Sequence, residues 1–360
     1  MYKKKNGFNL AALGLAGSGL LMVMFGYVNA QGEAPEVIET DSHRFTRMAE
    51  GVYQVTGTGT VYLMSNALMI VGDEDVLLVD SHVTPNAANA LLRSVAEVTD
   101  KPVRYLVNTH YHFDHAHGNQ VFPDQVEIIG HSFTRTKLNG EMGNVLTEAT
   151  HLSFTEGVPA LVESLKAQVA AATDPAERAK LQADLEVQEA HMISLREIVP
   201  TPPNITLEDK MTLYQTLSDG DREIQLLHLG RAHTAGDVMV YLPQERLIFT
   251  GDAMLPSLSY MGDSFPQDWV QTLEELKKLE FDIMLPGHGA PVQGKEKIGH
   301  FQAYIGDLWQ KTSAMKAQGL TAEQVAEQID MTNHAPNYGQ IRGPGADVRA
   351  IRRIYALLDE

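Results

Sequence analysis

Three histidines and one carboxylate stand within six positions of this chain. They lie in the stretch 109–115, which reads Thr-His-Tyr-His-Phe-Asp-His and follows the apolar run 103–107. Buried without a cation, these groups would need many hydrogen-bond partners and would repel one another on protonation. A metal ion removes both difficulties, because it holds the histidines neutral and the carboxylate ionised. Imidazole nitrogen and carboxylate oxygen are ligands that zinc takes in compact sites. The stretch therefore predicts a zinc site.

Three further motifs each place one potential ligand in a glycine-flanked turn. They read Gly-Arg-Ala-His-Thr-Ala-Gly-Asp at 230–237, Phe-Thr-Gly-Asp at 249–252 and Leu-Pro-Gly-His-Gly at 285–289. Each follows or ends a run that is typical of a strand. Glycine permits positive φ and lets the backbone approach an ion closely.

Taken in order, the four motifs resemble those of the metallo-β-lactamase-fold hydrolases, over roughly residues 45–291. The resemblance implies an α/β protein, a four-layer αββα sandwich with two metal ions in a cleft at one edge. It implies that His110, His112 and His233 hold the first ion. It further implies that the second ion is held by Asp114, His115 and His288, and that Asp252 bridges the two ions.

Two of these positions refine the resemblance. His112 stands where the diiron flavoprotein branch of the family would have Glu, which favours hydrolysis over redox chemistry and zinc over iron. Asp252 stands where the main true β-lactamase classes would have Cys or Ser, and Asp there is similar to the glyoxalase-II, lactonase and sulfatase branches. We expect two Zn²⁺ ions, although Mn or Fe would also suit an oxygen-rich site.

This ligand set predicts hydrolysis by a hydroxide shared between two ions about 3.5–4 Å apart. The chain has no cysteine, which excludes a thiolate nucleophile and thiolate ligands. Asp252, as the bridge, and Asp114, which can orient the hydroxide and pass a proton to the leaving group, are the expected catalytic residues.

The substrate would be a small molecule with an ester, lactone, thioester or β-lactam-type bond. Sulfate and phosphate esters stay open. The sequence shows no basic cluster suited to a sulfate or phosphate, although Arg231 lies close to His233, and this favours acyl substrates. The alternative is a non-hydrolytic exported metal-binding protein of the same fold, with a redox or persulfide accessory role.

Other polar residues near the motifs have supporting or ordinary roles. Asp80, at the end of the apolar run 76–79, is expected to orient a metal-binding histidine by a hydrogen bond. Tyr260 could donate to a developing oxyanion, and Trp269 is expected in the core. The remaining histidines either line the pocket, which is one interpretation of His82, His117 and His131, or are ordinary, as expected of His151, His191 and His300.

The elements that must position these groups alternate between strands and helices, with the chemistry at strand ends. Period-two and apolar runs predict strands at 52–55, 67–71, 76–79, 103–107, 126–129, 211–214, 223–229, 238–242, 247–250 and, as the last strand, 281–285. Helical patterns cover 85–98, 266–279, 294–309, 321–330 and 347–358.

Residues 140–203 interrupt this alternation. Two amphipathic patterns there, 159–172 and 175–196, each begin on a proline, which the first helical position tolerates. We expect a helical hairpin inserted into the α/β body, serving as a surface embellishment, as a lid or as a contact in a homodimer. One domain, 31–360, with a C-terminal helical extension at 294–360, is the simplest organisation.

The first thirty residues have the layout of a secretory signal: three lysines, an apolar stretch from 8 to 28 and a small-residue end. An uncleaved anchor is the alternative. We expect cleavage, no stable membrane anchor afterwards, and a periplasmic or secreted protein. Loss of this segment takes the net charge from −18 to −21, and so acidic a protein is not expected to bind nucleic acid.

Overall fold

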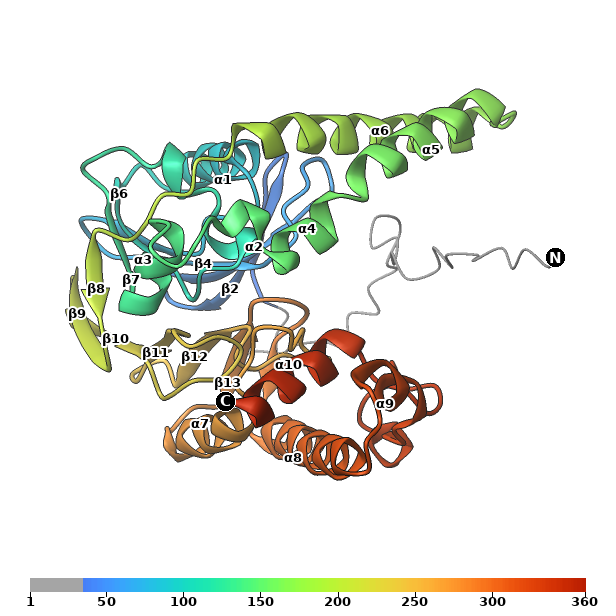
Figure 1. The fold of residues 1–360 in the computed structure, drawn as a ribbon. Helices are drawn as coiled ribbons and strands as arrows, with labels where there is room; N and C mark the ends of the chain where they lie inside the picture. Colours follow the sequence, from blue (N-terminus) through green and yellow to red (C-terminus); the bar gives the residue numbers. More distant parts are fainter. Residues whose placement is uncertain (1–34) are drawn as a thin grey trace.

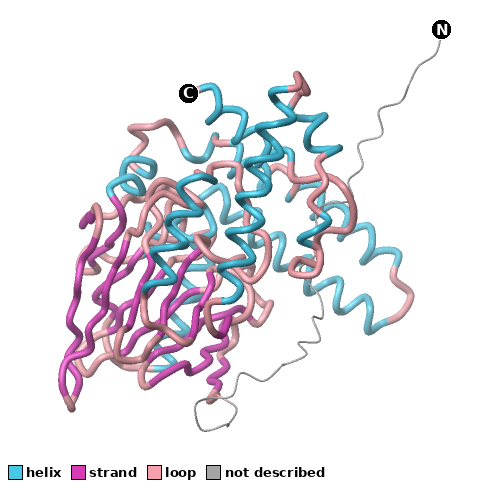
Figure 2. The backbone as a smooth tube through the Cα atoms, turned by 90° about the horizontal axis from the view of Figure 1, so that it is seen from below, coloured by secondary structure: helices cyan, strands magenta, loops and turns pink. Residues whose placement is uncertain are grey.

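Two β-sheets lie face to face between two layers of helices in the computed structural model, which describes residues 35–360 (Figures 1 and 2). The predicted signal segment, 1–30, lies outside the described residues. The first sheet has the order β1-β2-β3-β4-β5-β6-β7-β8, and the second has the order β14-β13-β12-β11-β10-β9. This is the α/β, αββα arrangement predicted from the sequence.

The strands of the first sheet are β1 (Val37–Glu39), β2 (His43–Ala49), β3 (Val52–Gly57), β4 (Ala67–Val71), β5 (Val76–Val79), β6 (Val103–Val107), β7 (Glu127–His131) and β8 (Ile205–Leu207). Those of the second are β9 (Lys210–Leu217), β10 (Gly220–Leu227), β11 (Met239–Leu242), β12 (Leu247–Gly251), β13 (Ile283–Pro286) and β14 (Val292–Gln293). The α-helices are α1 (Pro85–Val98), α2 (Phe113–Ala116), α3 (Ser132–Leu138), α4 (Ala149–Thr155), α5 (Val158–Ala171), α6 (Pro175–Ser194), α7 (Pro266–Lys278), α8 (Glu296–Ala317), α9 (Ala322–Gln328) and α10 (Val348–Asp359).

Strand β5 shows why these apolar runs form central strands. Its four residues are all buried, and they alternate between two cores. Leu77 and Val79 face the second sheet, whereas Val76 and Leu78 face the layer that contains α1. A strand covered on both faces has no polar side, so its sequence is a continuous apolar run rather than an alternating one.

The outer face of the second sheet is covered by α7, α8, α9 and α10. Trp269 on α7 is fully buried there, as predicted, and its indole nitrogen donates to the carbonyl of Ala253 at 2.8 Å. Phe301 on α8 packs edge-to-face on Trp269 with ring centroids 5.1 Å apart. The C-terminal helices thus lie against the sheet that carries Asp252 and His288.

The predicted helical hairpin is formed by α5 and α6. The two helices pack on each other through Val158, Val162, Leu165 and Leu185, and Figure 1 shows them side by side, projecting away from the sheets. The segment that contains them, together with α3 and α4, connects β7 to β8, which are parallel neighbours in the first sheet. The insertion is therefore a long crossover, and neither sheet changes its order to accommodate it.

Some elements differ from prediction. The strand at 281–285 was expected to be the last, but β14 follows it and pairs with β13. Strands β1, β2 and β8 were not predicted, because two are three residues long and β2 carries charged residues between its buried positions. Among residues 35–360, no helix combines the length and the apolar character that crossing a membrane requires.

Candidate metal centre

All seven predicted metal-binding residues lie beyond the carboxyl ends of strands. The stretch 109–115 leaves β6, His233 lies in the loop after β10, and Asp252 and His288 closely follow β12 and β13. The structure brings the seven side chains together in groups whose potential ligand atoms lie within 4.8 Å of one another. We refer to His110, His112 and His233 as the three-histidine group, and to Asp114, His115 and His288 as the second group.

The carboxylate of Asp252 stands between the two groups. Its Oδ2 lies 3.7 Å from Nε2 of His233 and 3.3 Å from Nε2 of His288. Its Oδ1 lies 3.4 Å from Nε2 of His115. Within the second group, Oδ2 of Asp114 is 3.0 Å from Nε2 of His288. One carboxylate therefore faces nitrogens of both groups, as a bridging ligand would.

Two glycines make this close approach possible. A Cβ at Gly287 would stand 2.3 Å from Oδ1 of Asp252 and 2.9 Å from Cε1 of His115. Gly251, at φ 53°, lies in the left-handed region, and a Cβ there would meet the side chain of Thr109 at 2.7 Å. The glycines of these motifs therefore leave room for the cluster itself.

Donor atoms without partners show that the cluster suits a cation. Nε2 of His110 and Oδ1 of Asp252 are buried and have no hydrogen-bond partner among the described residues. An unsatisfied buried polar atom costs about 1–3 kcal/mol. A divalent ion beside each group would supply the missing interaction, so the residues present fit the metals that the resemblance implies.

The electrostatics divide the cluster in two. Burial lowers the pKa of His110 well below its ordinary value and that of His233 to about 3. Burial alone would also lower the pKa of His115 and His288, but the surrounding carboxylates together outweigh it. Asp114, Asp252 and Asp80 raise the pKa of His115 well above its ordinary value, and Asp252 and Asp114 raise the pKa of His288 to about 10. A metal ion bound beside these carboxylates would displace protons from both imidazoles.

Asp80 orients His115, as predicted. Its Oδ2 lies 2.7 Å from Nδ1 of His115, while its Oδ1 accepts from the backbone N–H of Thr109 at 2.8 Å. Both Asp80 and His115 are fully buried. Because a carboxylate only accepts, Nδ1 of His115 carries the hydrogen and Nε2 is directed at the cluster.

Asp263 makes the corresponding contact to His112, and the sequence did not reveal it. Its Oδ2 accepts from Nε2 of His112 at 3.1 Å, which leaves Nδ1 of His112 facing Nε2 of His233 at 2.9 Å. Oδ2 of Asp263 also accepts from the hydroxyl of Thr150 on α4, and that hydroxyl lies 3.2 Å from the phenol of Tyr260. Asp263 stands in an irregular loop with no motif around it, so nothing short of the fold could have found it.

The other histidines do not join the cluster. His82 is buried against His43, with Nε2 atoms 3.3 Å apart, and His131 packs on His228. His117 lies beside His151 in the wall behind His112, and His191 packs on Tyr62 with ring centroids 4.2 Å apart. The expectation that His151 and His191 are ordinary fits these contacts. Among the residues near ligands, Arg231 pairs with Asp268 at 2.5 Å and lies over Phe265.

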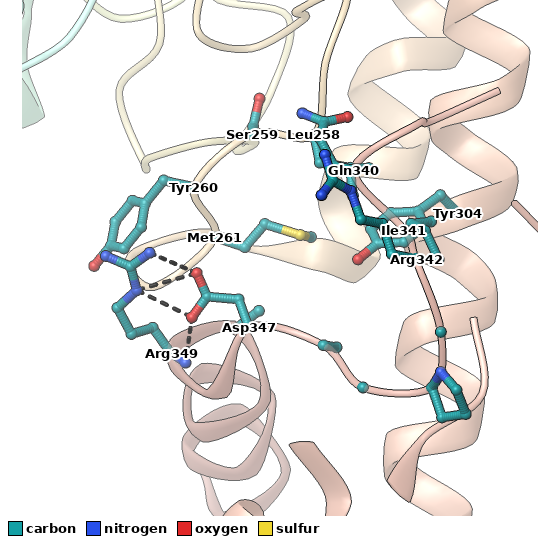
Figure 3. Close-up of a pocket in the computed structure, with 15 residues that line it drawn as sticks. Leu258, Ser259, Tyr260, Met261, Tyr304, Gln340, Ile341, Arg342, Asp347 and Arg349 are labelled. Carbon is teal, nitrogen blue, oxygen red and sulfur yellow. Dashed lines mark hydrogen bonds and ion pairs between the residues drawn. The ribbon is translucent and has the colours of Figure 1, made fainter. Parts of the chain in front are cut away.

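A cavity of about 600 Å³ opens beside Tyr260 (Figure 3). One wall is the loop 258–261, whose Ser259 hydroxyl donates to the backbone carbonyl of Asp252 at 3.3 Å. The opposite wall is the segment 340–350, where Arg349 pairs with Asp347 and lies over the ring of Tyr260 at 4.8 Å. Met254, Leu255 and Met261, which flank this loop or belong to it, are buried, and of these only Met261 reaches the cavity.

Two stacked sheets between helical layers, with a His and Asp cluster at the strand ends, define a class of metal-dependent hydrolases. Residues 61–288 match the family model described as the metallo-beta-lactamase superfamily, and the chain belongs to that superfamily. Its named relatives include an alkylsulfatase and a probable metallo-hydrolase, and the chain itself has His and Asp groups suited to divalent metals.

Named relatives lie at low identity. The linear primary-alkylsulfatase of Pseudomonas sp. (strain ATCC 19151) is 25% identical over 284 residues, which are 75% of this chain and 51% of that protein. The inverting sec-alkylsulfatase Pisa1 from Pseudomonas sp. superposes with a TM-score of 0.56 at 18% identity, covering 87% of this chain and 50% of Pisa1. The DIM-1 metallo-beta-lactamase superposes with a TM-score of 0.50 at 18% identity, covering 75% of this chain and 99% of DIM-1. The chain thus spans about half the length of the alkylsulfatases, and these likenesses in structure concern the fold.

Proposed function

We propose that the protein is a dinuclear, zinc-dependent hydrolase that cleaves an ester, lactone, thioester or β-lactam-type bond in a small molecule. The observation that carries the proposal is the Asp252 carboxylate, which lies within 3.7 Å of ligand nitrogens from both groups. Two ions bound there would supply an acidified water and a polarised scissile bond. Mn or Fe would serve the same donor set.

The side chains would divide the work by position. The three-histidine group would hold one ion, the second group the other, and Asp252 both. His288 is the most exposed of the seven, at 28% of its side chain, so substrate would enter from its side. Asp114 lies next to His288 and would take a proton from the attacking water and return it to the leaving group, a role typically worth about 10²–10⁴ in rate.

A second candidate substrate is a sulfate ester. Arg349, which the sequence did not associate with the site, lies over the ring of Tyr260 and brings a positive charge to the wall of the cavity beside it. One relative is named a linear primary-alkylsulfatase. Asp347 already neutralises Arg349, so acyl substrates remain the first choice.

Metal analysis joined to a substrate panel tests the proposal. We expect about two ions per chain, hydrolysis of at least one acyl ester, lactone, thioester, β-lactam or alkyl sulfate, and loss of that activity on chelation with recovery on adding zinc. His110→Ala and Asp252→Asn should each lower the rate at least about a hundredfold. Protein without stoichiometric metal, or His110→Ala with unchanged turnover, would contradict it.

Export and a homodimer belong to the proposal as well. Mass analysis of protein recovered from the periplasm or the medium should show loss of about residues 1–30, and sedimentation of that protein gives its oligomeric state. Intact protein retained in the membrane fraction would contradict export.

A further inference from the structure

The inserted segment touches the support of the metal centre at one residue. Thr150, on α4, is 5% exposed, and its hydroxyl contacts both Asp263 and Tyr260. Helix α4 is held in place by an ion pair of 2.7 Å between Glu148, just before it, and Lys137, and by Phe154, whose ring lies 5.2 Å from that of Phe113. Thr150 therefore reaches the centre from a helix that is fixed at both ends.

The chemistry of these groups sets the direction of each hydrogen bond. A carboxylate only accepts, and Thr150 has a single hydroxyl hydrogen, so Thr150 donates to Asp263. The phenol of Tyr260 must then donate to Thr150. Because Nε2–H of His112 donates to the same Oδ2, that oxygen receives two hydrogens from opposite partners.

This chain of donors controls how His112 is presented. Because Nε2 of His112 donates to Asp263, Nδ1 keeps its lone pair and faces Nε2 of His233, within the three-histidine group. The side chain of Asp263 is 29% exposed and comes from an irregular loop, and its carboxylate is held by His112 and Thr150, with the phenol of Tyr111 also beside it. Without the Thr150 hydroxyl the carboxylate could turn toward water and release the ring.

We propose that Thr150 is a positioning residue for the metal centre, through which α4 of the insertion holds Asp263 against His112 and thereby sets the affinity of the three-histidine group for its ion. This inference rests on the proposed function, since it assumes that the group binds a metal. It also separates α4 from the α5–α6 hairpin, which packs on itself, on α1 and, through His191, on Tyr62.

The experiment is a metal titration of the full, metal-free protein with Co²⁺ or Zn²⁺ in competition with a chelator. We expect Thr150→Val to lower the affinity for one of the two ions by about 10–100-fold, the usual cost of losing a group that orients a ligand. The affinity for the other ion should change by no more than a few-fold. Thr150→Ser, which keeps the hydroxyl, should restore the affinity. Thr155→Val is the matched control, because Thr155 lies on the same helix and its hydroxyl donates only to the carbonyl of His151.

A double-mutant cycle with Asp263→Asn tests whether Thr150 acts through Asp263. If it does, the double variant should bind the ion no more weakly than Asp263→Asn alone. Additive losses, or a Thr150→Val protein that keeps its metal-free thermal midpoint and binds both ions normally, would overturn the inference and leave the proposed function standing. Failure of the unaltered protein to bind any metal would overturn both, and the two results are therefore distinguishable.

Discussion

Replacing Asp80 by asparagine should lower the affinity of the second group for its ion and leave the affinity of the three-histidine group unchanged. The backbone tolerates the change, because Asp80 has φ 65° and asparagine adopts the left-handed region more readily than most residues. Asparagine can keep its carbonyl oxygen on the N–H of Thr109, which now donates at 2.8 Å. Its NH₂ then faces Nδ1 of His115, where a carboxylate oxygen lay at 2.7 Å.

An amide in that place reverses the hydrogen on the imidazole. Nδ1 must now accept, so the neutral ring carries its hydrogen on Nε2, the nitrogen that faces Asp114 and Asp252 at 3.4 Å. That nitrogen can bind a metal only after the ring gives up the new hydrogen bond. Loss of such an orienting partner costs about 10–100-fold in metal affinity, or about 1.4–2.7 kcal/mol.

Isothermal titration of metal-free protein with zinc measures the effect. The affinity of one of the two binding events should fall by that factor, while the affinity of the event assigned to the three-histidine group should not change. Asp282→Asn is the control, since this exposed carboxylate pairs with Arg246 and lies at the rim of the second sheet. If Asp80→Asn loads both ions with unaltered affinity, the tautomer argument fails.

Three further predictions concern other parts of the molecule. Gly287→Ala should displace the Asp252 carboxylate, which would stand 2.3 Å from the new Cβ. Metal analysis should show loss of bound ion, and urea unfolding should show about 1–3 kcal/mol less stability. Full metal occupancy in this variant would refute the steric reasoning. Burial lowers the pKa of His43 from 6.5 to about 4. Its contribution to stability is therefore complete above pH 6.5 and is lost as the pH falls toward 4, by roughly 1.4 kcal/mol per pH unit. The free energy of unfolding, measured by denaturation at pH 4.5 and 7.5, should differ less between the two pH values in His43→Gln than in the unaltered protein. Val162→Ala, at the α5–α6 contact, should cost about 2 kcal/mol locally and speed proteolysis of the hairpin while leaving metal content unchanged.

The fold could be predicted where a local pattern decides the structure. The run 76–79 is apolar on both faces because both faces are covered, and α1 begins where Thr84 caps it and Pro85 opens it. Strands β1 and β8 escaped prediction because each is only three residues long and holds its place by pairing with a neighbour rather than by its own pattern.

The candidate site divides in the same way. The seven donor residues carry their own signals, since their types and spacing make chemical sense only together. Asp263, Thr150 and Arg349 carry none: an aspartate in an irregular loop, a threonine on an inserted helix and an arginine near the end of the chain become meaningful only when three distant segments meet at Tyr260. Such contacts depend on tertiary structure, which no window along the chain contains.

The β7–β8 crossover makes the chain unusually open to engineering at one point. The turn between α5 and α6, at Thr173 and Asp174, is exposed and stands at the end of the projecting hairpin. Lengthening an exposed turn costs only about 0.6 kcal/mol for each doubling, and both sheets keep their register because the crossover already bridges neighbouring parallel strands. A fluorophore or an affinity peptide placed there would report on the protein, or immobilise it, far from the strand ends where the metals are expected to bind.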